Sequence, residues 1–343
     1  MDVSELLRFV VDSKGSDLHI SSGEPPVIRI HGEMTKIDMP SLDKDDVHNM
    51  IYDILNDFQR KVFEEDHELD FSFALGDLAR FRVNVFKQYR GDAAVFRTIP
   101  TKIPTFEELN LPKVFMDIAR YEKGLVLVTG PTGSGKSTTL AAIIDFINSN
   151  EKGHILTVED PVEFVHLSKK CLVNQRELGP HTHSFASALR SALREDPDVI
   201  LVGEMRDLET IQLALTAAET GHLVFGTLHT SGAPNTVDRI IDVFPAGQQN
   251  QVRAMVSESL MAVISQSLFK RKDGKGRVAA YEIMVASPAI RNLIRENKLA
   301  QIPSIMQTSK AIGMQTMEAA CQDLFAKNLV TKDEVAFFLP NPR

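Results

Sequence analysis

The spacing of hydrophobic and polar positions changes character near residue 100. Before it, stretches such as "LDFSFAL" and "RFRVNVFK" alternate in polarity or are rich in β-branched and aromatic residues, as half-buried strands are. Strands are predicted at 16–23, 25–34, 69–75, 80–87 and 92–99, and helical spacing covers 3–13 and 43–65. This half of the pattern predicts an α+β domain.

From Lys113 onward the pattern is different. The runs "GLVLVTG", "HILTVED", "DVILVGE" and "HLVFGTLH" are continuously apolar, which is typical of parallel strands buried on both faces. Helical patterns at about 136–149, 184–195 and 207–219 separate them, so we predict a doubly wound α/β domain. After about residue 245 the chain is predicted to be mostly helical, with one hairpin-like break at "KRKDGKGRVAAYEIM".

Residues 98–112, "TIPTKIPTFEELNLP", contain three prolines and little periodicity. Such segments commonly join domains and carry hinges. The predicted organisation is therefore a first domain over 1–97, a linker over 98–112 and a second domain over 113–343.

Composition narrows the class of protein. The 343 residues carry a net charge of −8, so a nucleic acid, which normally needs a basic face, is not an expected partner. The two cysteines, Cys171 and Cys321, form no disulfide framework or CxxC pair, and a reduced cytoplasmic setting fits them. The start of the chain does not resemble a signal peptide, and no apolar run approaches the length of a bilayer span. Any membrane role is expected to be peripheral.

The strongest motif is "GPTGSGKSTT", which fits G-x-x-x-x-G-K-[ST] between a predicted strand and a predicted helix. Its glycines let backbone N–H groups converge on phosphate oxygens, and the helix N-terminus adds partial positive charge. Lys136 can reach the β- and γ-phosphates, and Ser137 can place its hydroxyl on Mg²⁺, so ATP and Mg²⁺ are the expected cofactors. The predicted nucleotide-binding residues are Gly130, Pro131, Thr132, Gly133, Ser134, Gly135, Lys136, Ser137 and Thr138.

A second strand, in "DVILVGEMRD", has Gly203 where such ATPase strands usually end in an Asp that helps to hold Mg²⁺. The carboxylate comes one residue later, at Glu204. Ligands bind at the carboxyl edge of parallel sheets, and a carboxylate there can accept a proton from the attacking water. Glu204 is therefore the predicted general base.

The run "TVEDPVEF" places Glu159, Asp160 and Glu163 at another strand end. Uncompensated carboxylates beside a triphosphate would repel it, and a bound Mg²⁺ resolves this conflict. A solvated acidic turn is the alternative interpretation.

Histidines give weaker signals. His222 and His229 lie at either end of one predicted strand and on opposite faces, so they are not expected to share a metal ion. A structural role is common for such residues, but His229, close to Thr227, could contact the γ-phosphate. His181 and His183 are interpreted as parts of a solvated loop.

Phosphoryl transfer also gains from a cation placed on the developing charge. Arg82 and Arg97 lie on two predicted strands of the first domain, which has no other evident chemistry. Plain surface charge is an equally good interpretation of each arginine. The candidates in the second domain are Arg190, Arg194, Arg206 and Arg239.

Taken together, the motifs resemble those of a known family. "GPTGSGKSTT", "TVEDPVEF", "LREDPDVILVGEMRD" and "TGHLVFGTLHT" resemble, in order and spacing, the Walker A segment, Asp box, Walker B segment and His box of the type II/IV secretion ATPase superfamily. "PAIRNLIRENK" resembles the AIRNLIRE motif of its type IV pilus retraction branch, the PilT-type twitching motility ATPases.

The resemblance implies a RecA-like P-loop ATPase domain preceded by a smaller PAS-like domain, with nucleotide between the two domains of one chain. It also implies a homohexameric ring. The residues matched to family roles are Lys136 and Ser137 (Walker A), Glu204 (catalytic Glu), Glu163 (Asp-box acid, outer-shell to Mg²⁺), His222 and His229 (His box), and Arg82 and Arg97 (first-domain arginines that reach phosphate).

The implied function is ATP-driven pilus retraction at the inner face of the bacterial inner membrane. The implied partners are a pilus platform protein and a paralogous retraction ATPase. An accessory PilU-type motor, a pilus assembly or type II secretion ATPase, a nucleic-acid translocase and a nucleotide-gated switch are the alternatives. The assembly relatives carry a tetracysteine zinc site, for which this chain has too few cysteines.

Overall fold

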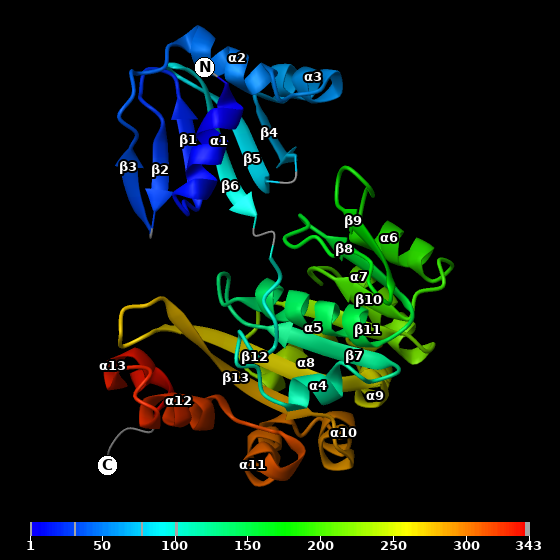
Figure 1. The fold of residues 1–343 in the computed structure, drawn as a ribbon. Helices are drawn as coiled ribbons and strands as arrows, with labels where there is room; N and C mark the ends of the chain where they lie inside the picture. Colours follow the sequence, from blue (N-terminus) through cyan, green and yellow to red (C-terminus); the bar gives the residue numbers. More distant parts are fainter. Residues whose placement is uncertain (1, 31, 77, 100–101, 340–343) are drawn as a thin grey trace. The chain divides into compact units, whose positions relative to one another are not determined.

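The computed structural model describes residues 2–30, 32–76, 78–99 and 102–339. The chain divides into two compact units, Met1–Lys102 and Ile103–Arg343, which are labelled by element in Figure 1. Each unit has its own hydrophobic core.

The first unit is an antiparallel sheet of six strands in the order β3-β2-β1-β6-β5-β4. Its helices are α1 (Val3–Asp12), α2 (Lys44–Tyr52) and α3 (Asp57–Asp66). Its strands are β1 (Asp17–Ser21), β2 (Val27–Ile30), β3 (Glu33–Lys36), β4 (Glu68–Leu75), β5 (Ala79–Gln88) and β6 (Gly91–Ile99).

Alternate residues of the central strands form the core of this unit with the three helices. Leu18, Phe81, Val83 and Phe96 are fully buried, and they pack in one cluster with side chains such as Leu7 of α1. Successive strand residues point to opposite faces, so the residues between them lie on the other face of the sheet. This agrees with the predicted α+β domain.

One helical prediction of the first unit is wrong in detail. Residues 43–65 form two helices, because Asn56 caps α3 and exchanges side-chain-to-backbone hydrogen bonds with Gln59. Asp43 and Asp46 form the same kind of capping box at the start of α2. The second cap interrupts what reads as one periodic stretch.

The predicted linker, 98–112, is mostly packed structure. Residues 98 and 99 complete β6, and Pro100 and Thr101 lie outside the described residues. Phe106 and Leu111 are buried in a core of the second unit, where the Phe106 ring stacks on Phe146 at 4.8 Å. The prolines mark an irregular backbone here, but the apolar side chains between them still find a core.

The second unit is a seven-stranded sheet in the order β13-β12-β7-β11-β10-β8-β9. All neighbours are parallel except β12 and β13, which are antiparallel, so the predicted mixed α/β fold is confirmed. The strands are β7 (Gly124–Thr129), β8 (His154–Glu159), β9 (Leu172–Glu177), β10 (Val199–Val202), β11 (Leu223–Leu228), β12 (Leu260–Lys270) and β13 (Arg277–Val285).

Helices bury both faces of this sheet (Figure 1). In β7, Leu125 and Leu127 belong to one core and Val126 and Val128 to the other, which explains its continuous apolar run. One core includes α4 (Val114–Ile118) and α5 (Lys136–Asn150). The other core includes α6 (Phe185–Ala192), α7 (Leu208–Glu219), α8 (Ala233–Asp242), α9 (Gln249–Ser259), α10 (Pro288–Arg295) and α11 (Ile302–Thr308).

The C-terminal part of the unit packs on β12 and β13. It contains α12 (Met317–Ala326) and α13 (Lys332–Val335), and the short 3₁₀ helices of this region are η1 (Leu299–Gln301), η2 (Lys310–Ile312) and η3 (Ala336–Phe338). The prediction of mostly helix after residue 245 is therefore wrong for 260–269, which form most of β12, whereas the predicted hairpin-like break at 270–284 is confirmed by the turn and β13. A short apolar run cannot be assigned to strand or helix from periodicity alone, and β9 was not predicted at all.

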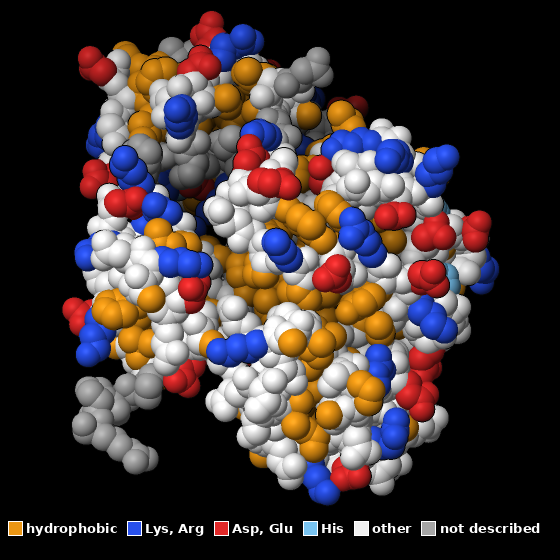
Figure 2. Space-filling view, turned by 60° about the horizontal axis from the view of Figure 1, so that its bottom comes forward, with side chains coloured by type: hydrophobic (Ala, Val, Ile, Leu, Met, Phe, Trp, Pro, Cys, Tyr) orange, Lys and Arg blue, Asp and Glu red, His pale blue; other side chains and the backbone are white. Residues whose placement is uncertain are grey.

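Figure 2 shows charged side chains of both signs mixed over the face in view, with hydrophobic side chains between them. Among the described side chains of that face, no continuous basic stripe stands out. Within the described ranges, the chain has no helix with the length and apolar character needed to cross a membrane.

The core of the first unit allows a matched test. Phe81→Ala empties a fully buried site in β5 and is expected to lower the free energy of unfolding of that unit by about 3–5 kcal/mol. Phe58→Ala, in α3 of the same unit, changes a side chain that is 75% exposed and should cost less than about 0.5 kcal/mol. Urea unfolding followed by circular dichroism measures both, and equal losses would contradict the described core.

Candidate functional site

The parallel strands β7, β8, β10 and β11 end at one edge of the second unit's sheet, and a pocket of about 380 Å³ lies there. This is the edge where open α/β sheets bind ligands. The lining residues are Thr132, Gly133, Gly135, Lys136, Ser137, Thr138, Glu159, Asp160, Pro161, Glu163, Phe185, Gly203, Glu204, Thr227, His229, Leu268 and Arg277.

The phosphate-loop motif runs from the end of β7 to the start of α5. Gly130 has a φ of 137°, and a Cβ atom on it would lie 2.3 Å from the carbonyl oxygen of Gln266 in β12, so glycine is required. Gly130, Pro131 and Ser134 shape the loop without lining the pocket. The other six predicted loop residues line it, which leaves the amides at the start of α5 beside the cavity.

Lys136 lies over its own loop. Its ammonium donates hydrogen bonds to the carbonyl oxygens of Gly130, at 2.9 Å, and Pro131, at 3.1 Å. Burial lowers the pKa of Lys136, while the carboxylates of Glu204 and Glu163 act in the opposite direction. The lysine is thus a partly desolvated cation between acids, which suits a phosphate ligand.

Glu204 follows β10 and reaches the pocket as predicted. Its carboxylate accepts hydrogen bonds from the Arg206 guanidinium, with a closest distance of 2.6 Å, and lies 3.2 Å from Nε2 of His229. The Arg206 hydrogen bond is the main reason that the pKa of Glu204 lies below its usual value, and His229 adds to the effect. Glu204 is therefore ionised at neutral pH and able to accept a proton.

The neighbouring strand β8 leaves little space for a side chain at Gly203. A Cβ atom on Gly203 would lie 3.1 Å from the Cα of Glu159 and from the carbonyl oxygen of Val158, both in β8. The Thr227 hydroxyl also donates a hydrogen bond to the Gly203 carbonyl. A side chain at 203 would therefore be crowded by β8.

The acids after β8 occupy two environments. Glu159 is sheltered, and its carboxylate accepts hydrogen bonds from Thr157 Oγ1 at 2.6 Å and Gln175 Nε2 at 3.2 Å. Burial raises the pKa of Glu159, against the effect of these hydrogen bonds. Glu163 is exposed and lines the pocket. Both carboxylates line the pocket, and a role of Glu163 beside Mg²⁺ stays a prediction.

The residues present fit a magnesium–nucleotide complex. Among the described residues, no three His, Cys, Asp or Glu side chains are grouped to hold a metal by themselves. Mg²⁺ usually keeps several waters and binds one or two protein oxygens together with the substrate phosphates. The Ser137 hydroxyl and the Glu163 carboxylate, which line the same pocket, provide such a partial set.

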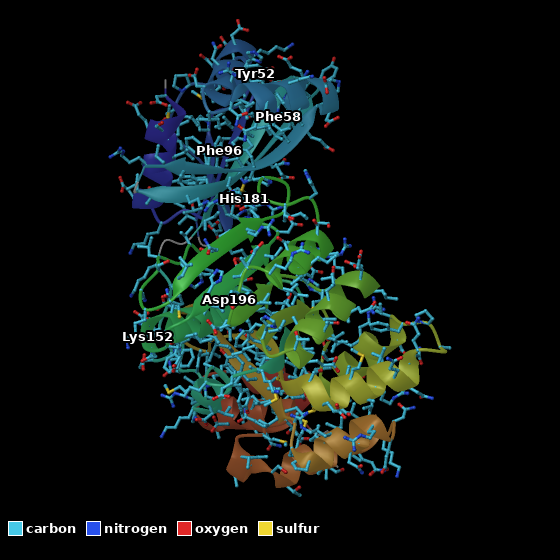
Figure 3. The ribbon with its side chains drawn as sticks, turned by 90° about the vertical axis from the view of Figure 1, so that its right-hand side faces the viewer. Tyr52, Phe58, Phe96, Lys152, His181 and Asp196 are labelled. Carbon is cyan, nitrogen blue, oxygen red and sulfur yellow. The ribbon has the colours of Figure 1, made fainter. Side chains whose placement is uncertain are left out.

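Two histidine predictions have different outcomes. His229 lies at the carboxyl end of β11 in the pocket, while His222 lies at the other end of this six-residue strand, roughly 20 Å away along it. His222 Nδ1 is 3.0 Å from the Ala217 carbonyl oxygen. A nucleotide contact of His222 in its own chain is therefore wrong, because the strand carries it to the opposite edge of the sheet. His181 lies exposed in the loop after β9 (Figure 3).

The first-unit arginines are brought together within their own sheet. Arg82 of β5 and Arg97 of β6 are direct cross-strand partners. Arg97 Nε lies 2.9 Å from an Asp17 carboxylate oxygen, and Arg82 Nε lies 3.9 Å from one of Asp70. Each arginine therefore already has a carboxylate near it within its own sheet. That they reach a nucleotide phosphate stays a prediction.

Sequence reasoning missed one basic residue of the pocket. Arg277, the first residue of β13, lines it and donates a hydrogen bond from Nη1 to the Gly133 carbonyl oxygen at 3.4 Å. The basic residues of the hairpin around Arg277 were the available signal for this site. Their position beside the phosphate loop depends on the order of strands in the sheet. Of the arginines considered in this domain, Arg190 pairs with Glu209, and neither Arg194 nor Arg239 lines the pocket.

Comparisons with known proteins agree with this site. A family model described as "Type II/IV secretion system protein" matches residues 2–336. The chain is 61% identical to the type IV pilus retraction ATPase PilT of Pseudomonas aeruginosa, over 97% of this chain and 96% of that protein. It is 62% identical to a twitching motility protein of Neisseria gonorrhoeae, over 90% and 82% of the two chains. A crystal structure of the pilus retraction motor PilT with bound ADP has a TM-score of 0.94 and 48% identity, covering 100% of this chain and 98% of that one.

Glu204→Gln tests the general base. The substitution keeps the shape of the side chain and removes its basicity, so ATP should still bind while turnover falls by about 10²–10⁴-fold. Steady-state phosphate release and nucleotide titration measure the two effects. Glu209→Gln, an exposed glutamate outside the pocket, is the matched control, and wild-type turnover by Glu204→Gln would reject the assignment.

Arg206→Gln tests the electrostatics of the base. Arg206 lowers the pKa of Glu204, so the wild-type carboxylate stays ionised to lower pH. Without the guanidinium that pKa rises, and the acid limb of the kcat/KM profile should move to higher pH. The pH dependence of ATP hydrolysis measures this shift, and Arg194→Gln should leave it in place. An unmoved limb would show that another group controls the acid side.

Proposed function

This chain belongs to the type II/IV secretion system protein family and is an ATPase, and we propose that its ATP hydrolysis drives the retraction of type IV pili. The observation that carries the proposal is the extent of the similarity to a pilus retraction ATPase, which covers 97% of this chain. It spans both units, so it includes the whole described site and not the phosphate loop alone.

The site supports a direct hydrolysis mechanism. Backbone amides at the start of α5 and the Lys136 ammonium bind the β- and γ-phosphates. Glu204 orients a water molecule and accepts its proton as it attacks the γ-phosphorus. Ser137, and Glu163 through water, would hold Mg²⁺ together with the phosphates, and the ion would neutralise charge on the phosphate oxygens. His229, which lies beside Glu204 and lines the pocket, would contact the γ-phosphate.

The mechanical part of the proposal rests on the first unit. Arg82 and Arg97 supply positive charge to the nucleotide phosphates, so phosphate release removes a ligand that holds them. Removing one of these charges should therefore lower turnover more than it lowers nucleotide affinity.

The same proposal includes the setting of the motor. We expect a homohexameric ring at the inner face of the bacterial inner membrane, working on a pilus platform protein and beside a paralogous retraction ATPase. In this setting the ring converts local changes at each nucleotide into movement of the pilus base.

Deletion of the gene in its native host tests whether the ATPase drives retraction or assembly of pili. Retraction predicts more surface pili and loss of twitching, with both restored by the wild-type chain and neither by Glu204→Gln. Electron microscopy of surface pili and stab-plate motility measure these outcomes. Absence of pili would instead support an assembly motor, and unchanged pili with normal twitching would reject a motor role in this system.

A further inference from the structure

The segment that carries Glu163 is held from the side by a strand that has no assigned part in the chemistry. This segment, residues 160–166, is called the acidic loop below. Gln175 of β9 makes three hydrogen bonds around it. Gln175 Oε1 accepts from the backbone N–H of His166 at 2.7 Å, and Nε2 donates to the Phe164 carbonyl oxygen at 2.9 Å and to the Glu159 carboxylate at 3.2 Å.

Glu177 continues this attachment two residues along β9. Side chains at positions i and i+2 of a strand share one face, so Gln175 and Glu177 both point toward the acidic loop. Glu177 is 4% exposed, and its Oε2 accepts the backbone N–H of Val162 at 3.1 Å. The amides of Val162 and His166 and the carbonyl of Phe164 are thus bonded to side chains of β9.

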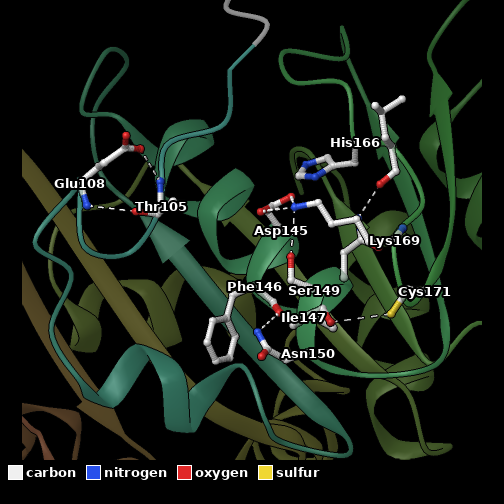
Figure 4. Close-up of polar contacts among 12 residues, drawn as sticks. Thr105, Glu108, Asp145, Phe146, Ile147, Ser149, Asn150, His166, Lys169 and Cys171 are labelled. Atoms are coloured by element: carbon white, nitrogen blue, oxygen red, sulfur yellow. Dashed lines mark hydrogen bonds and ion pairs between the residues drawn. The ribbon is translucent and has the colours of Figure 1, made fainter.

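The far end of the acidic loop is fixed by α5, the helix that begins at the phosphate loop. Asn148 donates from Nδ2 to the Leu167 carbonyl oxygen at 2.7 Å and accepts the Lys169 N–H at 3.0 Å. Lys169 Nζ also bonds the Asp145 carboxylate at 2.7 Å, as Figure 4 shows. The chain between β8 and β9 is therefore anchored on two sides.

This anchoring decides which way the acids point. Val162, Phe164 and His166 are buried, and Glu163 between them is exposed and lines the nucleotide pocket. A smaller cavity of about 40 Å³ is lined by the same Glu163 together with Ser137. The buried side of the loop faces its anchors, while Asp160 and Glu163 line the pocket that Ser137 also lines.

We propose that Gln175 and Glu177 are positioning residues of the ATPase, which hold the acidic loop so that Glu163 faces the Ser137 side of the magnesium–nucleotide site. The inference rests on the proposed Mg²⁺-dependent hydrolysis. Groups that orient metal-binding side chains typically contribute roughly 10–100-fold to metal affinity or activity. Neither residue touches the nucleotide in this arrangement, so their effect passes through Glu159 and the loop.

Glutamine is chemically suited to position 175. Its amide accepts one hydrogen bond and donates two, which is what the His166 N–H, the Phe164 carbonyl and the Glu159 carboxylate require. A glutamate there keeps the acceptor, loses both donors and places a second carboxylate against Glu159. Gln175→Glu is therefore expected to be more damaging than Gln175→Met, although glutamate is closer in shape.

The test separates nucleotide binding from the contribution of the metal. ADP affinity of the full-length chain is measured by calorimetry with and without Mg²⁺, alongside kcat for ATP. Gln175→Met should bind ADP without Mg²⁺ as the wild type does, since the phosphate loop is unchanged. Its gain in ADP affinity from Mg²⁺ and its kcat should each fall by about 10-fold or more.

Conservative variants distinguish positioning from general folding. Glu177→Gln keeps an oxygen for the Val162 amide and should retain most of the Mg²⁺ gain, whereas Glu177→Leu should lose it. Asn174→Ala, at an exposed position next to Gln175 in β9, is the control that should change neither quantity.

Two results would overturn the role of β9. One is a Gln175→Met variant with a wild-type Mg²⁺ gain and kcat, and the other is an equal loss of ADP affinity with and without Mg²⁺. A wild-type chain that gains no affinity from Mg²⁺ would reject the metal site as well, so failure of the proposed function is distinguishable from failure of this inference.

Discussion

The close contact between the phosphate loop and β12 is the constraint on which the rest of the site depends. Gly130 has no room for a side chain against the Gln266 carbonyl, and Thr139 of α5 donates to the Gln266 side chain at 2.8 Å. This contact fixes the loop and the start of α5 against one strand. Because β12 pairs with β13, the same contact also brings Arg277 to the pocket.

The second constraint is the crowding of carboxylates at the sheet edge. β8 and β10 are adjacent, so Glu159 takes the space that a side chain at position 203 would need. Glu204 is then paired with Arg206, and Glu163 is directed to the pocket by the acidic loop. The acids thereby have separate surroundings: Glu159 is buried and hydrogen-bonded, Glu204 is paired with Arg206, and Glu163 is exposed in the pocket.

Much of this arrangement could be predicted from local sequence. The phosphate loop, four of the parallel strands and their helices were correct because each is specified by residues within about fifteen positions of one another. The predictions were wrong where local patterns were ambiguous. The pattern predicted helix for most of β12 and no strand at β9. It also predicted one helical stretch where the Asn56 cap separates α2 from α3. Phe106 and Leu111 of the predicted linker are buried in the second unit, because burial depends on the side chains packed against a residue and not on its local sequence.

The sequence by itself determined the chemistry of the nucleotide site, since glycine conformations, a lysine and a hydroxyl at fixed spacing suffice to define a phosphate loop. Only the tertiary structure decided which distant groups join it. Strand order placed His229 in the pocket and His222 at the opposite edge, paired Arg82 with Arg97, and set Gln175 against the acidic loop. The physical reason is that backbone conformation is set locally, whereas strand pairing joins segments that are remote along the chain.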